Sequence, residues 1–297
     1  MLNLDNGTQP VVLQSHAGSL HFGVAYPDND AGTRLDVRLL SEQLIVTNGT
    51  SSSRTSVVHM GGGQNLQRCT TLSGGTVQNP RRVTVQAGHQ NADLICRVAG
   101  TNTSFIGTWT VIGARTTLSF ARNEALGVNA LNSVTLKDGG KPSLHTSTKA
   151  DPSWTLENRT VQGVGSVLLG TAKPLTVGTD GCLIPGETNA VGMMSLTASN
   201  IVLTSGSHLK VDLAGDTSYD SLAVTVHAAG SLTLGGALEV ATLGGYEPAI
   251  RQTWPIMTVS GAISGEFDSV PNGYEVYVDG TLVMLKRSPQ GTMIIVR

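Results

Sequence analysis

The chain has 297 residues, of which 36 are Gly and only 12 are aromatic (4 Phe, 5 Tyr and 3 Trp), and 13% are charged. Gly and β-branched residues disfavour helices, so this composition excludes an all-α fold, while 39% hydrophobic residues argue against general disorder. The net charge is −2, and neither sign runs in blocks, which argues against nucleic acid as a partner.

Residues 1–70 are expected to form an N-terminal β region or cap. Residues 34–39 alternate apolar and polar side chains as a strand does, but the pattern continued to Leu44 also fits a helical period. We favour the strand. The stretches 48–53 and 61–63 are rich in Gly, Ser and Thr and predict loops. The first seven residues lack a basic region followed by an apolar one, so we expect a mature or truncated chain.

From about Thr70 onward, short alternating runs are separated by Gly or Asn-Gly at intervals of roughly 10 to 12 residues. This pattern predicts strands joined by turns. The clearest runs lie at 82–88, 93–100, 108–113, 133–140 and 208–215. Alternate side chains of a strand share one face, so each run has one apolar surface that another element must cover.

Two architectures bury such surfaces: a sandwich of two sheets, or a solenoid whose strands line one continuous interior. The scarcity of aromatic residues favours the solenoid, because a narrow interior is filled by Val, Leu, Ile, Ala and Thr. With roughly 20 to 25 residues per coil, we expect about a dozen coils spaced about 4.8 Å apart. The fold class expected is all-β, with rungs of a parallel β-helix at 71–243.

Residues 244–297 are expected to form a C-terminal β cap. Aromatic residues and Pro come together there, as in Tyr246, Pro248 and Trp254 followed by Pro255, after Gly244 and Gly245. A cap is needed because an uncovered last rung leaves unpaired strand edges that invite end-to-end association.

Several phrases between Thr155 and Val270 resemble, in their order, the passenger-associated repeats of autotransporter-type bacterial surface proteins. They lie at 163–167, 175–178, 181–186, 206–213, 219–224, 232–240 and 264–267. Upstream, Gly107-Thr108-Trp109 and Ala125-Leu126-Gly127 are similar to two further phrases of the repeat.

The resemblance implies a right-handed parallel β-helix that is exported and displayed on, or released from, a bacterial cell. Such stalks serve adhesion or spacing, so the function expected is that of a non-enzymatic rigid stalk or adhesin-like passenger. The expected partners are extracellular polysaccharide or host-cell ligands, and a separate outer-membrane barrel. A complete family member also carries a signal peptide and a C-terminal membrane barrel, and we recognise neither in the sequence.

The sequence contains one candidate cluster of acidic residues, in which Asp residues are spaced by four: Asp212, Asp216 and Asp220. In a strand and turn they do not share one face, so we expect them to be solvated or to stabilise turns. Ca²⁺ binding by these residues, or by Asp28 and Asp30, is the less favoured reading. We therefore predict no catalytic, cofactor-binding or metal-binding residues and no cofactor.

For the His, Cys, Arg and Trp residues and the Gly-rich stretches, the sequence predicts structural roles. The seven His residues match no metal motif, and residues 61–63 and 235–236 lack the Lys of a phosphate loop. Cys69, Cys96 and Cys182 match no zinc spacing; buried free thiols are expected, and a Cys69–Cys96 disulfide is the alternative. Arg81 and Arg82 are expected at an exposed corner. Core or cap packing is expected for Trp109, Trp154 and Trp254, in preference to sugar stacking.

Two other functions stay open. One is a polysaccharide lyase or glycosidase built on a β-helix, which needs two carboxylates, or Ca²⁺-binding acids with a basic residue, converging from adjacent rungs. The other is a subunit of a trimeric fibre or tailspike.

Overall fold

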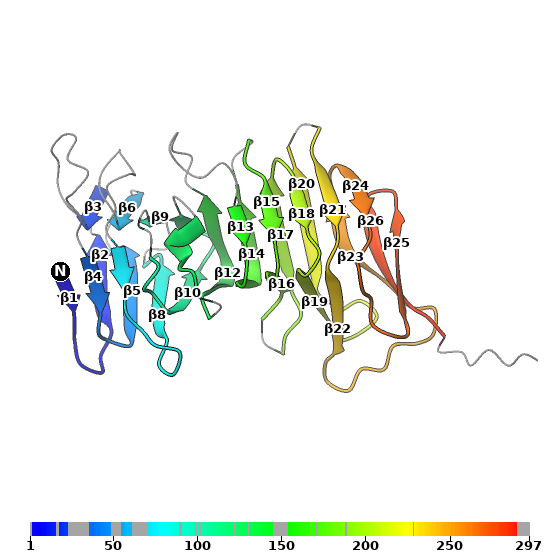
Figure 1. Ribbon diagram of the computed structural model, residues 1–297, viewed down its shortest axis with the longest axis horizontal. Helices are drawn as coiled ribbons and strands as arrows, with labels where there is room; N and C mark the ends of the chain where they lie inside the picture. Colours follow the sequence, from blue (N-terminus) through cyan, green and yellow to red (C-terminus); the bar gives the residue numbers. More distant parts are fainter. Residues whose placement is uncertain are drawn as a thin grey trace, which may run out of the picture.

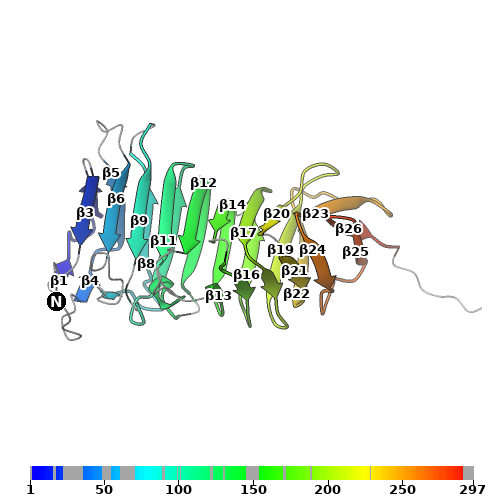
Figure 2. The same ribbon diagram turned by 90° about the horizontal axis from the view of Figure 1, so that it is seen from above.

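The computed structural model describes residues 2–15, 18–22, 36–48, 55–60, 71–88, 91–98, 100, 102–120, 123–129, 131–144, 154–169, 172–187, 189–227 and 229–289. These residues form 26 strands and one short 3-10 helix, so the expected all-β class is confirmed. Figure 1 and Figure 2 show the strands side by side along one long axis, from β1 at one end to β25 at the other. In the described part, no helix has the length and apolarity that a membrane crossing requires.

The strands lie in three rows. Row one contains β1 (Leu2–Leu4), β4 (Asp36–Leu39), β7 (Thr71–Ser73), β13 (Trp154–Leu156), β15 (Leu175–Val177), β18 (Ile201–Leu203), β21 (Ser231–Leu234) and β24 (Ala262–Gly265). Row two contains β2 (Val11–Ser15), β5 (Gln43–Asn48), β8 (Arg81–Gln86), β10 (Gly107–Ile112), β16 (Cys182–Pro185), β19 (His208–Leu213) and β22 (Ala237–Thr242). Row three contains β3 (Gly18–Phe22), β6 (Ser56–Met60), β9 (Leu94–Val98), β11 (Thr116–Phe120), β17 (Met193–Ala198), β20 (Ser221–Val226) and β23 (Thr253–Val259). The longer strands β12 (Ser133–Leu144) and β14 (Thr160–Leu168) begin in row two and end in row three.

The chain visits rows one, two and three in the same order again and again, and neighbouring strands within a row pair in parallel. We call one such passage a layer. The row-two register aligns nine inward-facing residues into one ladder: Val11, Leu44, Val83, Trp109, Val134, Val161, Leu183, Leu209 and Leu238. The described residues therefore contain nine layers, fewer than the dozen expected. The reason is that some layers take more residues than the roughly 20 to 25 expected. For example, Val83 lies 39 positions after its partner Leu44 in the neighbouring layer.

The alternation in the sequence becomes an inside and an outside of the stack. In β8, Val83 and Val85 have no exposed surface, while Thr84 between them is half-buried on the outer face. Burying an aliphatic side chain contributes about 1.5 to 3 kcal/mol relative to leaving it exposed. Because each ladder residue packs on the equivalent residue of the next layer, the core is one continuous column.

The segment 34–44 is a clear test of strand against helix. Its described part forms β4 and the start of β5, with a corner at residues 40–42, so the strand is confirmed and the helical alternative is wrong. Leu39 and Leu44 are both fully buried on either side of this corner. Ser41 at the corner is also buried, and its Oγ accepts a hydrogen bond of 2.7 Å from the N–H of Asn6.

Row one is interrupted between β7 and β13. Two segments take the place of strands there: Phe105, which makes a single bridge to Gly74, and the 3-10 helix η1 (Asn123–Leu126). The short coiled ribbon lies between the labels β9 and β13 in Figure 1. Beneath the interruption the rings of Phe105, Trp109 and Phe120 form a chain of contacts with centroid distances of 5.4 and 5.6 Å. Aromatic side chains thus make up part of the buried core at the interruption.

The C-terminal end departs from the parallel pattern. β23 and β24 still pair in parallel with β20 and β21. The hairpin of β25 (Tyr274–Asp279) and β26 (Leu282–Arg287) then follows, and β26 pairs antiparallel with β23. This hairpin covers the row-three edge of the last layer. At the other end, the parallel rows begin at β1, so the described part of residues 1–70, predicted as an N-terminal β region or cap, carries the first two layers.

Candidate functional site

The three Asp residues singled out in the sequence do not form one cluster, although Asp212 and Asp220 lie near each other. Asp216 is exposed in a loop, Asp212 is half-buried on the outer face of β19, and Asp220 is fully buried just before β20. Asp220 stabilises turns, as expected: its Oδ1 accepts the N–H of Gly192 at 2.7 Å and its Oδ2 accepts the N–H of Asp212 at 3.0 Å. Its complete burial was not expected. No group of three or more potential metal ligands occurs within the described ranges, and Asp28 and Asp30 lie outside them.

The cysteines that the structure describes are buried free thiols. Desolvation raises the pKa of Cys96 to about 12 and that of Cys182 to about 11, so both stay protonated at neutral pH. The expected buried thiol is confirmed for these two residues. Cys69, the proposed disulfide partner of Cys96, lies outside the described residues.

The three Trp side chains are fully buried, so the predicted packing role is confirmed. Trp109 Nε1 donates to the carbonyl of Leu126 at 3.0 Å, and Trp254 Nε1 donates to the carbonyl of Gly215 at 3.1 Å. A ring buried in this way offers no face for sugar stacking.

Arg81 and Arg82 occupy a corner at the start of β8. The side chain of Arg82 is exposed and pairs with Glu42 at 3.6 Å, and Arg81 Nε donates to the carbonyl of Leu39 at 3.4 Å. Gly236 has a φ of +68° in a turn, as predicted for residues 235–236. Residues 61–63 lie outside the described ranges, and so do His16, His89 and His145, while only the backbone is described for His21 and His59.

The outer face of row two carries a charged cluster near its C-terminal end. Glu239 lies between His208, at 2.7 Å from Nδ1, and Lys210, at 3.0 Å from Nζ. Asp180 is 4.0 Å from the other ring nitrogen of His208. The hydrogen bonds from Lys210 and His208 outweigh the desolvation of Glu239 and lower its pKa, so its carboxylate is engaged with side chains of its own chain. The charged side chains of this cluster therefore pair with one another.

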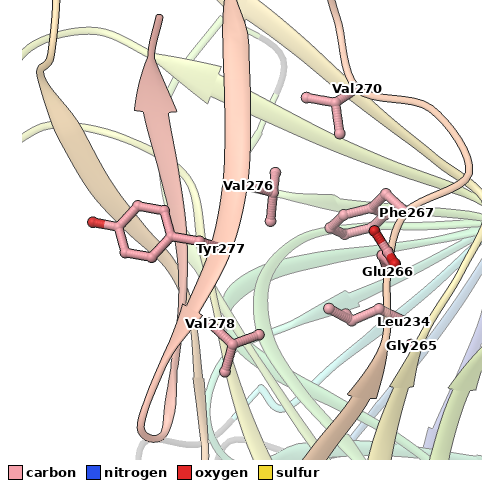
Figure 3. Close-up of a pocket in the computed structure, with 8 residues that line it drawn as sticks. All are labelled: Leu234, Gly265, Glu266, Phe267, Val270, Val276, Tyr277 and Val278. Atoms are coloured by element: carbon pink, nitrogen blue, oxygen red, sulfur yellow. The ribbon is translucent and has the colours of Figure 1, made fainter.

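A second feature is the apolar groove at the C-terminal end, shown in Figure 3. It has a volume of about 270 Å³ and lies between β25 and the segment that follows β24. In Figure 3, Val276 faces Phe267 across the groove, whereas Tyr277 points the other way. Among its lining residues only Glu266 and Tyr277 are ionisable, so the groove offers few groups for catalysis or for binding a charged ligand.

The third feature is a polar recess of about 450 Å³ at the row-one interruption, and it is the strongest candidate site. It is lined by Glu124, Val128, Thr155, Glu157, Asn158 and Arg159. Glu124 comes from η1, Thr155 from β13, and the three consecutive residues Glu157, Asn158 and Arg159 from the corner between β13 and β14. The recess therefore joins two adjacent layers.

Arg159 is the buried member of the recess, with 9% of its surface exposed. Its Nε donates to the carbonyl of Glu157 at 3.0 Å. Desolvation lowers the pKa of Arg159, while the nearby carboxylates of Glu124 and Glu157 oppose that shift. An arginine stays charged in proteins, so the lining of the recess combines one guanidinium with two nearby carboxylates.

The amino-acid sequence alone did not indicate that these residues form a site. Glu124 precedes the Ala-Leu-Gly phrase, and residues 157–159 appear as an ordinary turn between two alternating runs. No local pattern links the two segments, because their proximity depends on which strands stack.

No protein-family model matches the chain, and no curated protein matches it.

Proposed function

We propose that the protein is an exported bacterial surface protein that acts as a rigid stalk or adhesin-like passenger. In this proposal the three rows form a right-handed parallel β-helix. The order of the repeat-like phrases between Thr155 and Val270 supports the proposal, as do the parallel rows to which most of those phrases contribute strands.

The observation that carries the proposal is the unbroken inward ladder of row two, from Val11 to Leu238. Each layer pairs with the next in register, so bending the stack requires strand hydrogen bonds and core contacts to be disturbed together. A structure of this kind holds its two ends at a fixed separation. Its outer faces are long and repetitive, and such surfaces bind weakly per contact and gain by multivalency.

The test is display of the complete chain on a non-adherent bacterium, placed between a signal peptide and an outer-membrane barrel. We expect the cells to adhere to polysaccharide-coated or host-cell surfaces more than cells that carry the barrel alone, and we expect external protease to abolish the adhesion. For the stalk role, a binding domain fused to the end of the chain should reach a recessed ligand that the same domain on the bare barrel does not reach. Failure of both assays with protein on the surface contradicts the proposal.

One observation favours a second candidate, a polysaccharide lyase or glycosidase. Glu124 and Glu157 line the same recess from adjacent layers, and glycoside hydrolysis uses a pair of carboxylates. Release of reducing or unsaturated sugar ends, lost in both Glu124→Gln and Glu157→Gln, would establish this activity in place of the non-enzymatic role. No product from a panel of polysaccharides would eliminate it.

A further inference from the structure

The recess exists because the row-one ladder is broken. Elsewhere in row one each short strand is covered by the next, as β15 covers β13. On its other side β13 faces η1, whose 3-10 backbone makes no strand pairing with it among the described residues. The recess lies at this interruption, where η1 and β13 meet without strand pairing. Thr155 of the lining belongs to β13, and its neighbours Trp154 and Leu156 are fully buried in the core. This part of the lining is therefore held in place before binding, which reduces the entropy lost on binding.

The lining of the recess has the mixed hydrogen-bonding chemistry that a sugar requires. Glu124 and Glu157 accept hydrogen bonds, Arg159 donates them, and Thr155 and Asn158 do both. Val128, which is 47% exposed, adds an apolar side for the C–H face of a sugar ring. The volume of about 450 Å³ falls within the range of about 300 to 1,000 Å³ that small-molecule sites occupy.

The charge of the recess selects among sugars. Two carboxylates outnumber the single guanidinium, so the net charge of the lining is negative and a uronic acid is repelled. A neutral sugar brings only hydroxyl groups. Its O–H groups donate to the carboxylates, and charge-assisted hydrogen bonds of this kind are about twice as strong as neutral ones.

We propose that the recess formed by Glu124, Val128, Thr155, Glu157, Asn158 and Arg159 binds a neutral sugar unit of an extracellular glycan. The inference rests on the proposed function in that it supplies the contact through which an adhesin-like passenger holds its ligand. The rest of the stack then positions this contact at a distance from the cell.

The test is isothermal titration calorimetry of the full chain with three neutral hexasaccharides, cellohexaose, mannohexaose and N-acetylchitohexaose, and with hexagalacturonate as the acidic probe. We expect at least one neutral probe to bind and hexagalacturonate to bind at least about tenfold more weakly, in line with the charge of the lining. Glu157→Gln should weaken the neutral sugar about five- to tenfold, because a charged acceptor becomes a neutral one of the same shape.

Two further variants separate the site from its fold. Asn158 has a φ of +53°, a conformation that Gly adopts readily, so Asn158→Gly removes the amide, keeps the corner and should also weaken binding. Glu266→Gln, in the groove of Figure 3, is the matched control and should leave affinity unchanged. Circular dichroism confirms that each variant is folded.

The outcomes distinguish the two proposals. If no neutral probe binds while displayed cells still adhere, the sugar recess is wrong and the surface function stands. Equal binding of the acidic probe, or equal weakening by Glu266→Gln, also overturns the recess. If the neutral probe binds at this site and is cleaved, the recess is confirmed and the non-enzymatic role is wrong.

Discussion

Asp220 shows how one buried side chain ties two layers together. Its carboxylate accepts backbone N–H groups from Gly192 before β17 and from Asp212 in β19, and its own N–H donates to the carbonyl of Asp212 at 2.8 Å. Desolvation raises the pKa of Asp220 to about 7, and the nearby Asp212 carboxylate adds to the shift. The two hydrogen bonds oppose the shift without cancelling it, so burial is the dominant effect.

The raised pKa of Asp220 predicts a pH dependence of stability. Its usual value, 3.8, applies to the unfolded chain, so between about pH 4 and pH 7 the folded protein binds a proton that the unfolded chain does not. This contribution to stability is fully present below pH 3.8 and is lost as pH rises through about 7. In urea titrations at several pH values, Asp220→Asn should flatten the decline in the free energy of unfolding across this window.

Asp212→Asn is the comparison for that experiment. Desolvation also raises the pKa of Asp212, but this residue is only half-buried, so the variant should flatten the decline less. Identical slopes in the wild type and Asp220→Asn would show that the Asp220 carboxyl does not titrate in this window.

The β25–β26 hairpin illustrates protection at the scale of an element. Leu285 of β26 is fully buried, opposite Trp254 of β23 on one side and Val276 of β25 on the other. Antiparallel pairing with β23 occupies an edge that would otherwise be open to another chain. The hairpin therefore stabilises the last layer and also blocks association at row three.

Leu285→Asp should detach this hairpin. The substitution places an unpaired charge in the core and should destabilise the hairpin by at least about 3 kcal/mol. The freed edge of β23 should then cause concentration-dependent association, measured by light scattering coupled to size-exclusion chromatography. The control is Tyr277→Asp, on the exposed face of the same hairpin. This variant should show the same association state as the wild type. Association in both variants, or in neither, would contradict a protective role for the hairpin.

For the whole molecule, the layered arrangement implies that stability is local. Each layer contacts only its neighbours, so a weakened layer opens without the distant ones. Asn132 is a suitable probe, since it is fully buried within the row-one interruption. Its Oδ1 accepts the N–H of Gly107 at 2.9 Å, and its Nδ2 donates to the carbonyl of Phe105 at 3.1 Å.

Asn132→Ala leaves both of these backbone groups buried without partners, at a cost of about 2 to 4 kcal/mol. In hydrogen exchange, we expect peptides from β8, β10 and β12 to lose protection, while β19 to β23 keep theirs. Asn129→Ala is the control, because its side chain makes an exposed contact with the N–H of Leu131. A uniform loss of protection along the chain would show that the stack unfolds as one cooperative unit.

Much of the fold was predictable because strand alternation is a local property. Val83 and Val85 alternate with Thr84 in sequence, and the two Val side chains are buried in the structure. Trp254 was likewise expected to pack in the core or a cap, and its side chain is fully buried. Residues two positions apart in a strand share a face whatever the rest of the chain does, so these features follow from the sequence alone.

The tertiary structure decided which segments stack, and thereby made the candidate site. Glu124 and Arg159 line one recess because η1 and the corner after β13 occupy adjacent layers, and Asp220 reaches the N–H of Gly192 because their layers are adjacent too. Register between strands a full layer apart depends on loop lengths and on packing of the whole core, which vary from layer to layer. The sequence therefore determined the strands and their inner faces, and the tertiary structure alone determined the recess.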